Sequence, residues 1–412
     1  PRAMAELIES YNLSPIGLIA VLTIFYLILG MFMDGLSSVV LTMAIVEPMI
    51  RQAGIDVIWF GIFLVVVIET AQVTPPIGFN LFVLQGMTNH EIGYIAKTAI
   101  DAPWQPGEMR PYGNISISPA AGVINYGQGL FEGMKAYRTV DGSVVLFRPK
   151  ENAKRMQRGA RRLGMPEVPE DMFLDAVIKT VKENSRWIPP IGKGTLYIRP
   201  LLMGSGAILG VAPAPEYTFL VYVSPVGPYF KGGLEPTSLK ISKEHHRAAP
   251  GGSGGVKAIG NYAPGMVPSK NAKGEGFAEI IYLDAVNNKY IEEVGAANFF
   301  CIKDEIISTP ELTGTILGGI TRLSIIEIAR SKGYEVREEK IDVEYALEAD
   351  ECFCAGTAAV VSSIGSIKHG DRVVEYCNGG VGSITREIYD SLVAIQEKRS
   401  PDTFDWLIEL DI

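Results

Sequence analysis

The chain has 412 residues, 47% of them hydrophobic, and its 37 basic and 46 acidic residues give a formal net charge of −9. This length allows two or three domains, since domains usually span ~100–200 residues, and the acidic balance excludes a nucleic-acid surface, which needs concentrated basic charge. Four cysteines are too few for a disulfide framework in a chain this long. His245 and His246 would face opposite sides of a strand, and Cys352 and Cys354 are better explained as buried apolar residues than as zinc ligands or a redox pair. We therefore expect no metal centre.

The first hundred residues have the composition of a membrane segment. Residues 10–33, 57–68 and 70–90 carry no charge, and the first of these runs is long enough to cross the ~30 Å hydrocarbon layer as a helix. Buried helices in a large soluble core are the alternative. The segment "TAQVTPPIGFNLFVLQG" (70–86) argues against this alternative, because two prolines and a glycine interrupt its apolar run. In lipid such an interruption is tolerated where protein or a water-filled cavity satisfies the freed backbone groups.

This break, together with "LGMFMDG" (29–35), resembles the large membrane subunit of tripartite ATP-independent periplasmic (TRAP) transporters over about residues 1–99. The resemblance implies an all-α transmembrane fragment over 1–100, with the proline break as a hairpin tip near substrate and sodium sites. It corresponds only to the C-terminal part of that subunit, so we assign no transport activity. The junction with the following sequence, near Ala102, is either a true fusion or an artefact of gene assembly.

From about residue 103 the pattern becomes that of a soluble protein with helices and strands. Strands are predicted at 142–149, 194–204 and 216–225, helices at 150–164 and 169–185, and a further helix from Thr321. Two hairpins are predicted, with turns at Asn287-Asn288 and near Asp304. The glycine- and proline-rich stretch 227–235 reads as a linker. We therefore expect two mixed lobes, 103–226 and 236–412.

Lys257 lies in an unusual setting, "APGGSGGVKAIGNY" (249–262). It is not a phosphate-loop lysine, since that motif needs glycine before the lysine and serine or threonine after it. A surface lysine in a flexible loop and a Schiff-base lysine both remain open on spacing alone. An apolar setting disfavours the charged amine, lowers its pKa and makes it nucleophilic, and glycines would let the backbone approach a flat ring.

Six motifs around this lysine occur in one order over residues 125–358: "NYGQGLFEGMKAYR", "YIRP", "GGVKAIGNYA", "YIEEVGAANFF", "LGGITR" and "FCAGTA". Together they closely resemble the branched-chain amino-acid aminotransferases, two-lobe fold-type IV α/β (α+β) enzymes that depend on pyridoxal 5′-phosphate (PLP). D-amino-acid aminotransferases and aminodeoxychorismate lyases share this fold, but "YIRP" and "FEGMKAYR" argue against both.

The resemblance implies a role for each matching residue. Lys257 would carry PLP and move the proton between Cα and C4′, Glu293 rather than Glu292 would face the pyridine nitrogen, and Tyr262 would bind the phenolic oxygen. The phosphate would be held by Arg155, by Ile320 and Thr321 at a helix N-terminus, and by Thr357.

The resemblance also implies a pocket that accepts an aliphatic side chain and that of glutamate in turn. Arg199 would pair with the γ-carboxylate of glutamate, and the backbone of Thr357 and Ala358 would hold the α-carboxylate. The remaining walls would be Tyr126, Phe131 and Tyr197, with Tyr229 on a closing loop.

This sequence differs from the family in two respects. The CxxC redox pair of the animal enzymes is replaced by Ala359 and Ser362, so we expect no such switch. About 40 family residues before the "YGN" region have no counterpart, so we expect the first lobe to be truncated at its N-terminus. We further expect a homodimer, a cytoplasmic enzyme, and membrane contact only through residues 1–100.

Overall fold

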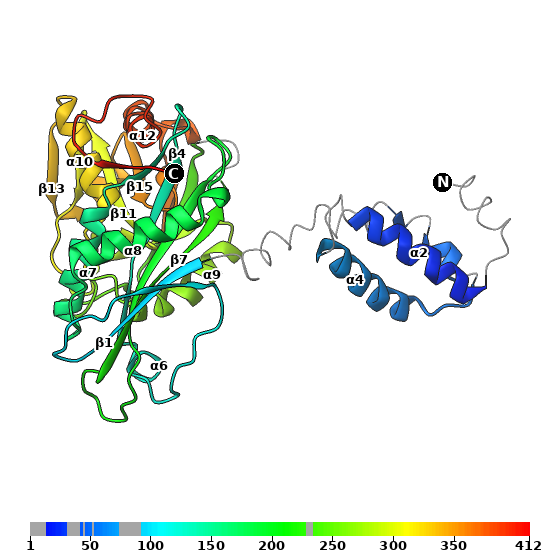
Figure 1. Ribbon diagram of the computed structural model, residues 1–412. Helices are drawn as coiled ribbons and strands as arrows, with labels where there is room; N and C mark the ends of the chain where they lie inside the picture. Colours follow the sequence, from blue (N-terminus) through cyan, green and yellow to red (C-terminus); the bar gives the residue numbers. More distant parts are fainter. Residues whose placement is uncertain (1–13, 31–41, 44–45, 52, 74–91, 228–233) are drawn as a thin grey trace. The chain divides into compact units, whose positions relative to one another are not determined.

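The computed structural model describes residues 14–30, 42–43, 46–51, 53–73, 92–227 and 234–412. The chain divides into two compact units, residues 1–91 and residues 92–412, called here the first and the second unit (Figure 1).

The first unit is built on two apolar helices, α2 (Pro15–Gly30) and α4 (Val57–Val73). Tyr26, Phe60 and Leu64 are buried in one cluster, yet Ile16 and Ile58 on the same helices are 83% and 77% exposed. Within the described ranges, no helix is both long enough and apolar enough to span a membrane, so the expected transmembrane fragment is not shown. The proline break and residues 31–35 lie outside the described residues.

The second unit begins earlier than the sequence predicted. Strand β1 (Ile92–Ala99) pairs antiparallel with β7 (Glu216–Val226) and with β2 (Glu108–Pro111). In the structure these residues therefore belong to the sheet of the second unit, eight residues before the boundary expected at residue 100. The burial pattern explains why these residues form a strand. Tyr94, Ala96 and Thr98 are each 3% exposed and alternate with more exposed neighbours, as in a half-buried strand.

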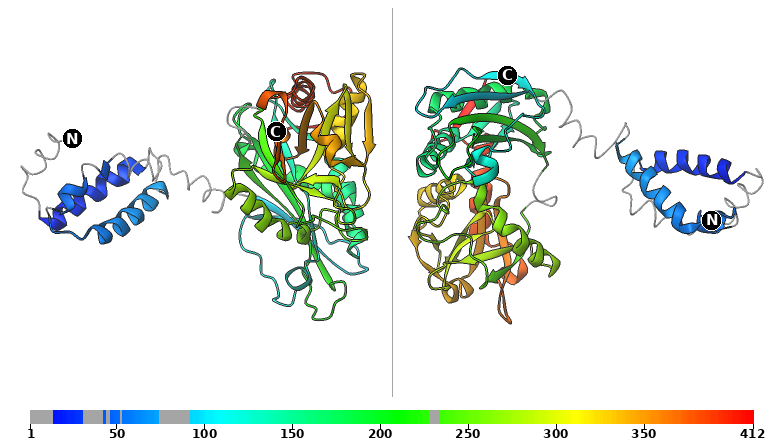
Figure 2. Two further views of the ribbon diagram at one scale, coloured as in Figure 1. Left: turned by 180° about the vertical axis from the view of Figure 1, so that it is seen from behind. Right: turned by 90° about the horizontal axis from the view of Figure 1, so that it is seen from below.

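The first lobe of the second unit is an antiparallel sheet with strand order β18-β5-β4-β6-β7-β1-β2 and with β3 beside β6. Helices α7 and α8 lie over one face of it (Figure 1). The last strand of the chain, β18, pairs with β5, so it belongs to this lobe and not to the lobe predicted for 236–412 (Figure 2). The elements are β3 (Gly129–Phe131), β4 (Met134–Arg138), β5 (Val144–Phe147), β6 (Thr195–Gly204), β18 (Leu407–Leu410), α6 (Gly122–Tyr126), α7 (Pro149–Arg162) and α8 (Glu170–Glu183).

The second lobe is a mixed sheet with strand order β13-β12-β11-β15-β16-β8-β9-β10-β14 and with β17 beside β16. Both predicted hairpin turns are confirmed, since Asn288 and Asp304 adopt φ angles of 55° and 50°. The strands are β8 (Thr237–Ser242), β9 (Glu279–Leu283), β10 (Tyr290–Val294), β11 (Ala297–Lys303), β12 (Ile306–Pro310), β13 (Val336–Glu339), β14 (Ile341–Asp342), β15 (Glu351–Gly356), β16 (Val360–His369) and β17 (Arg372–Glu375). The helices are α9 (Met266–Gly274), α10 (Ile320–Ser331), α11 (Val343–Leu347) and α12 (Ser383–Gln396).

Candidate active site

A cavity of about 870 Å³ is lined by residues of both lobes of the second unit. Phe131 and Arg199 line it from the first lobe, and Lys257, Tyr262 and Thr357 line it from the second. Residues that are far apart in the sequence therefore meet around one space, which is large enough for a small-molecule site.

Two glycines before Lys257, Gly254 and Gly255, have a packing role that the sequence did not predict. A Cβ atom on Gly254 would collide with the carbonyl oxygen of Thr315, and one on Gly255 would lie 2.9 Å from the carbonyl oxygen of Gly314. These glycines thus let the lysine loop pack directly on the backbone of the 314–315 loop.

The amine of Lys257 lines the cavity, and no carboxylate of the described residues forms an ion pair with it. Its Nζ donates a hydrogen bond to the Tyr262 hydroxyl at 3.0 Å and lies 4.5 Å from the centroid of the Phe131 ring. The Lys257 carbonyl accepts from the Phe131 amide at 3.2 Å. Burial, followed by the charge of Arg155, lowers the pKa of Lys257 to about 7, so much of the amine is neutral and nucleophilic near neutral pH.

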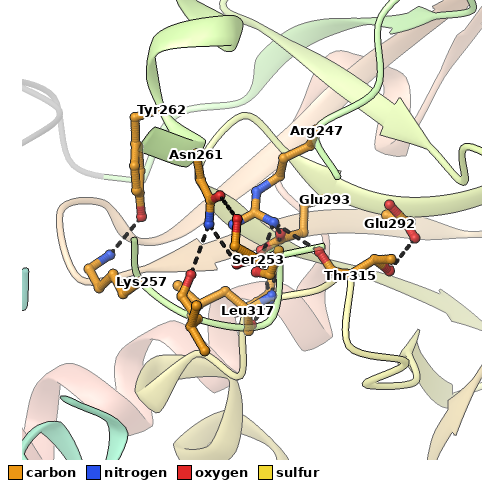
Figure 3. A network of polar contacts seen from close by, with 12 residues as sticks. Arg247, Ser253, Lys257, Asn261, Tyr262, Glu292, Glu293, Thr315 and Leu317 are labelled. Atoms are coloured by element: carbon orange, nitrogen blue, oxygen red, sulfur yellow. Dashed lines mark hydrogen bonds and ion pairs between the residues drawn. The ribbon is translucent and has the colours of Figure 1, made fainter. Parts of the chain in front are cut away.

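Glu293 is buried at the end of β10 in a network of polar contacts (Figure 3). Its Oε2 pairs with Arg247 Nη1 at 2.5 Å, and its Oε1 accepts from Asn298 Nδ2 at 3.3 Å. Burial raises the pKa of Glu293 to about 7, although Arg247 acts in the opposite direction. Lys257 and Glu293 are close enough for each charge to act on the pKa of the other.

Glu292 and Glu293 are consecutive but have different partners. The pairing of β10 with β9 shifts register between Ile291 and Glu293, and such a bulge redirects side chains. Glu292 accepts a hydrogen bond from the Thr315 hydroxyl and lies at the opposite end of the network from Lys257 (Figure 3). The geometry therefore favours Glu293 over Glu292 as the carboxylate near the lysine.

Arg155 on α7 is held by a carboxylate that sequence reasoning did not identify. Its Nε and Nη2 donate to the two oxygens of Glu132 at 2.8 and 2.6 Å, and its Nη1 donates to the Gly318 carbonyl at 3.1 Å. Glu132 is fully buried, and Asn152 Nδ2 donates to it at 2.8 Å. Three of the five guanidinium N–H donors are used in these contacts, so two stay available for an anion.

Ile320 and Thr321 form the first turn of α10, where backbone N–H groups have no partner within the helix. These two residues line one small cavity together with Gly133 and Thr357. The Thr357 hydroxyl donates to the Gly133 carbonyl at 3.2 Å. The predicted phosphate ligands Ile320, Thr321 and Thr357 are thus brought together.

Arg199 stands over the Phe131 ring, with its guanidinium carbon 4.6 Å from the ring centroid. Its Nη2 donates to the Tyr197 hydroxyl at 3.0 Å. Arg199 Nε is buried and lacks a hydrogen-bond partner among the described residues, so this cation has donor capacity for a ligand. A Cβ on Gly133 would collide with the Tyr197 hydroxyl, which explains glycine at this position.

Ala358 also lines the main cavity, as predicted, whereas Tyr126 does not belong to the lining that the structure describes. Tyr126 is 40% exposed, and its hydroxyl donates to the carbonyl of Leu209. The prediction that Tyr126 lines the pocket is therefore not supported within this chain. Tyr229 lies outside the described residues.

Three polar residues near the cavity were missed by sequence reasoning: Arg247, Glu132 and Lys135. Lys135 is 9% exposed, burial lowers its pKa to about 8, and its Nζ donates to the Ala358 carbonyl at 2.8 Å. For Glu132 and Lys135 the sequence did contain a usable indication, since both charges lie in the otherwise apolar stretch "GLFEGMKAY". A charge in such a stretch is expected to be buried and therefore to need a partner.

Comparisons with known proteins agree with these features. A model of class IV amino-transferases matches residues 129–367. A model of the DctM component of tripartite ATP-independent periplasmic transporters matches residues 1–104. The chain is 52% identical to an Arabidopsis thaliana protein named branched-chain-amino-acid aminotransferase 5, chloroplastic, over 79% of this chain and 78% of that protein.

Two solved structures extend the comparison. The branched-chain amino acid aminotransferase of Escherichia coli is 28% identical, with a TM-score of 0.67, over 76% of this chain and 98% of that one. The branched-chain aminotransferase of the archaeon Thermoproteus uzoniensis, solved with norvaline, is 26% identical, with a TM-score of 0.65, over 77% of this chain and 99% of that one. Both solved chains are covered almost completely, and β1 adds to the first lobe a strand from residues that were assigned to the transmembrane fragment.

Proposed function

The chain belongs to the class IV aminotransferases and, within them, to the branched-chain amino-acid aminotransferases, and we propose that its second unit transfers the amino group of leucine, isoleucine or valine to 2-oxoglutarate with PLP. The observation that carries this proposal is a buried lysine amine that lines a cavity between the two lobes, bonds to Tyr262, and is close enough to the buried Glu293 for their charges to interact. Such a lysine can act both as a nucleophile and as a proton carrier at neutral pH.

Residues in and beside the cavity have the chemistry that PLP needs. The first-turn amides of α10 and the two remaining N–H groups of Arg155 are donors for a phosphate, and the Thr357 hydroxyl would become one by leaving the Gly133 carbonyl. Lys257 offers an amine for covalent attachment, and Tyr262 lies within hydrogen-bond distance of that amine. When bound, PLP supplies an electron sink that makes the Cα proton of an amino acid removable.

Each residue then has one task in the transfer. Lys257 would take the Cα proton and return it at C4′, because burial lowers the pKa of its amine to about 7. Glu293 would face the pyridine nitrogen of the cofactor, and Arg247 holds that carboxylate and favours its charged form. Tyr262, which accepts from the lysine amine, would bind the phenolic oxygen.

We propose that one pocket accepts both substrates, because different walls contact the aliphatic side chain and the side chain of glutamate. Phe131 supplies apolar surface for an aliphatic side chain, and Arg199, bound to Tyr197, supplies the cation for the γ-carboxylate of glutamate. The backbone of Thr357 and Ala358 holds the α-carboxylate common to both substrates. Lys135, which binds the Ala358 carbonyl, fixes this turn.

Borohydride reduction of the PLP-loaded enzyme followed by peptide mapping tests the attachment. We expect the cofactor on the peptide that contains Lys257. Lys135 is the matched control, because it is also buried and its pKa is also lowered, to about 8. A label on Lys135, or no label on either lysine, would contradict the assignment.

Substrate choice is tested separately with 2-oxoglutarate as acceptor. Leucine should donate its amino group and D-alanine should not. The reverse preference would favour a D-amino-acid aminotransferase, the alternative within this fold.

We also propose a homodimer, supported by apolar surface near the cavity. Leu209 and Val211 are 83% and 90% exposed, and Ile124 on the neighbouring α6 is 55% exposed. Burying such residues at an interface is favourable. Light scattering should give a dimer for the wild-type chain and a smaller species for Leu209→Asp; a monomeric wild-type enzyme would refute the proposal. A cytoplasmic location stays a prediction.

For the first unit we propose membrane attachment without transport activity. Ile58, Ile62 and Val65 on α4 are 77%, 64% and 61% exposed, and exposed apolar surface of this extent is costly in water. The full chain should stay in the membrane pellet after alkaline carbonate extraction, and a chain starting at residue 92 should not. Release of the full chain by carbonate would sink this proposal.

A further inference from the structure

A second cavity, of about 270 Å³, lies beside β10 in the second lobe. Its lining includes Val286, Glu292, Thr313, Thr315 and Lys340, none of which lines the main cavity. It is slightly smaller than the ~300–1,000 Å³ of most ligand pockets, and at ~30 Å³ per water it has the volume of about nine waters, which suits a small molecule.

Glu292 carries an oxygen atom in this region that has no hydrogen-bond partner. The residue is 6% exposed. Its Oε1 accepts from the Thr315 hydroxyl, but its Oε2 is buried and unpartnered among the described residues. An unpaired buried carboxylate oxygen is unfavourable, so the position calls for a donor that the described residues do not supply.

Of two neighbouring charged residues, Lys340 does not supply the missing donor, and Asp284 already has donors of its own. Asp284 also lines the cavity, but its carboxylate accepts from the backbone amides of Asn287, Lys289 and Tyr290 at 2.6, 2.9 and 2.8 Å. Lys340 lies over the Tyr290 ring, 5.8 Å from its centroid, and in the described part of the chain no ion pair joins it to Glu292. Glu311 also lines the cavity but is partly exposed, so Glu292 is the buried carboxylate of this lining with an unpartnered oxygen among the described residues.

The other walls define what kind of donor fits. The hydroxyls of Thr313 and Thr315 lie 2.9 Å apart, which places further acceptor oxygens near Glu292. Val286 and Ile316 add apolar surface, the first 71% exposed and the second 4% exposed. A compact group with several N–H donors on a short aliphatic chain satisfies both features.

We propose that this cavity binds a small aliphatic amine, with its primary ammonium group on Glu292 and Thr313 and its carbon chain on Val286 and Ile316. The site is independent of the proposed transamination. It is, however, linked to Glu293 through one residue, Arg247, because the Thr315 carbonyl accepts from Arg247 Nη1 at 2.9 Å and the same nitrogen pairs with Glu293.

The test is calorimetric titration of the PLP-loaded chain with butylammonium chloride after borohydride treatment, so that the amine cannot react with the cofactor aldehyde. We expect one saturable site whose affinity falls at least tenfold in Glu292→Gln, equal to about 1.4 kcal/mol. Glu335→Gln, at an exposed glutamate paired with Arg337, is the control and should bind like the wild type.

A second variant separates loss of the charge from loss of the fold. Val286→Trp would obstruct the exposed edge of the cavity without changing Glu292, and it should also abolish binding. Equal affinity in wild type and Glu292→Gln, or no binding to the wild type, would overturn the proposal. Displacement of the amine by an equal concentration of potassium chloride would show a site for simple cations and would overturn the assignment to an amine.

Discussion

Arg247 allows a sharp test of the electrostatics around Glu293. The two side chains are 7% and 2% exposed and their charged atoms are 2.5 Å apart. Arg247→Met would leave Glu293 without its cation and the carbonyls of Gly254 and Thr315 without a donor. Removing one partner of a buried pair typically costs about 3–5 kcal/mol, so we expect a large loss of stability at alkaline pH.

The loss should depend on pH in a definite direction. Burial already places the folded-state pKa of Glu293 near 7, above its ordinary value of 4.5, and Arg247 is the first cause that lowers it. A carboxyl with a raised folded pKa contributes stability that is present below its unfolded pKa and is lost as pH rises through its folded pKa. Without Arg247 the pKa rises further, so from pH 5.5 to pH 8.5 the variant should lose up to about 2 kcal/mol more than the wild type, at about 1.4 kcal/mol per unit above pH 7.

The assay is urea unfolding of the cofactor-free chain at both pH values. Arg337→Met is the matched control, because Arg337 pairs with Glu335 at 2.6 Å but both side chains are about half exposed, at 45% and 57%. That variant should show a small loss that does not change with pH. If Arg247→Met is destabilised equally at pH 5.5 and pH 8.5, the reasoning about Glu293 is wrong.

Three further predictions concern Lys257, the Glu132 carboxylate that holds Arg155, and the Cys354 thiol. Because burial lowers the pKa of Lys257 to about 7, the rate of PLP attachment to the cofactor-free chain, followed by absorbance, should rise with pH with a midpoint near 7; a midpoint near 10 would contradict this. Glu132→Gln removes the negative charge that holds Arg155. It should weaken PLP retention on dialysis at least tenfold, while borohydride still labels Lys257. Unchanged retention would show that Glu132 does not position Arg155. Burial raises the pKa of Cys354 to about 12, so dilute peroxide should leave transamination unchanged, and an inhibition reversed by thiol reductant would reveal a redox switch after all.

Local sequence patterns determined much of the second unit. The helical stripe of 150–164 became α7, and the turn residues Asn288 and Asp304 adopt the positive φ angles that such turns need. These features follow from contacts a few residues apart, which periodicity records directly. Strand β1 was missed although its alternation is present in the sequence, because it directly follows a long apolar run.

By itself, the sequence determined the family and, through the order of its motifs, the choice of Lys257, Tyr262 and Glu293. Only the tertiary structure decided that Arg247 meets Glu293, 46 residues away in the numbering, that Glu132 holds Arg155, and that the Tyr126 hydroxyl donates to the Leu209 carbonyl. The physical reason is that a buried charge acquires its partner from whatever strand or loop the fold brings beside it. Such pairings join distant parts of the chain and leave no period or spacing in the sequence.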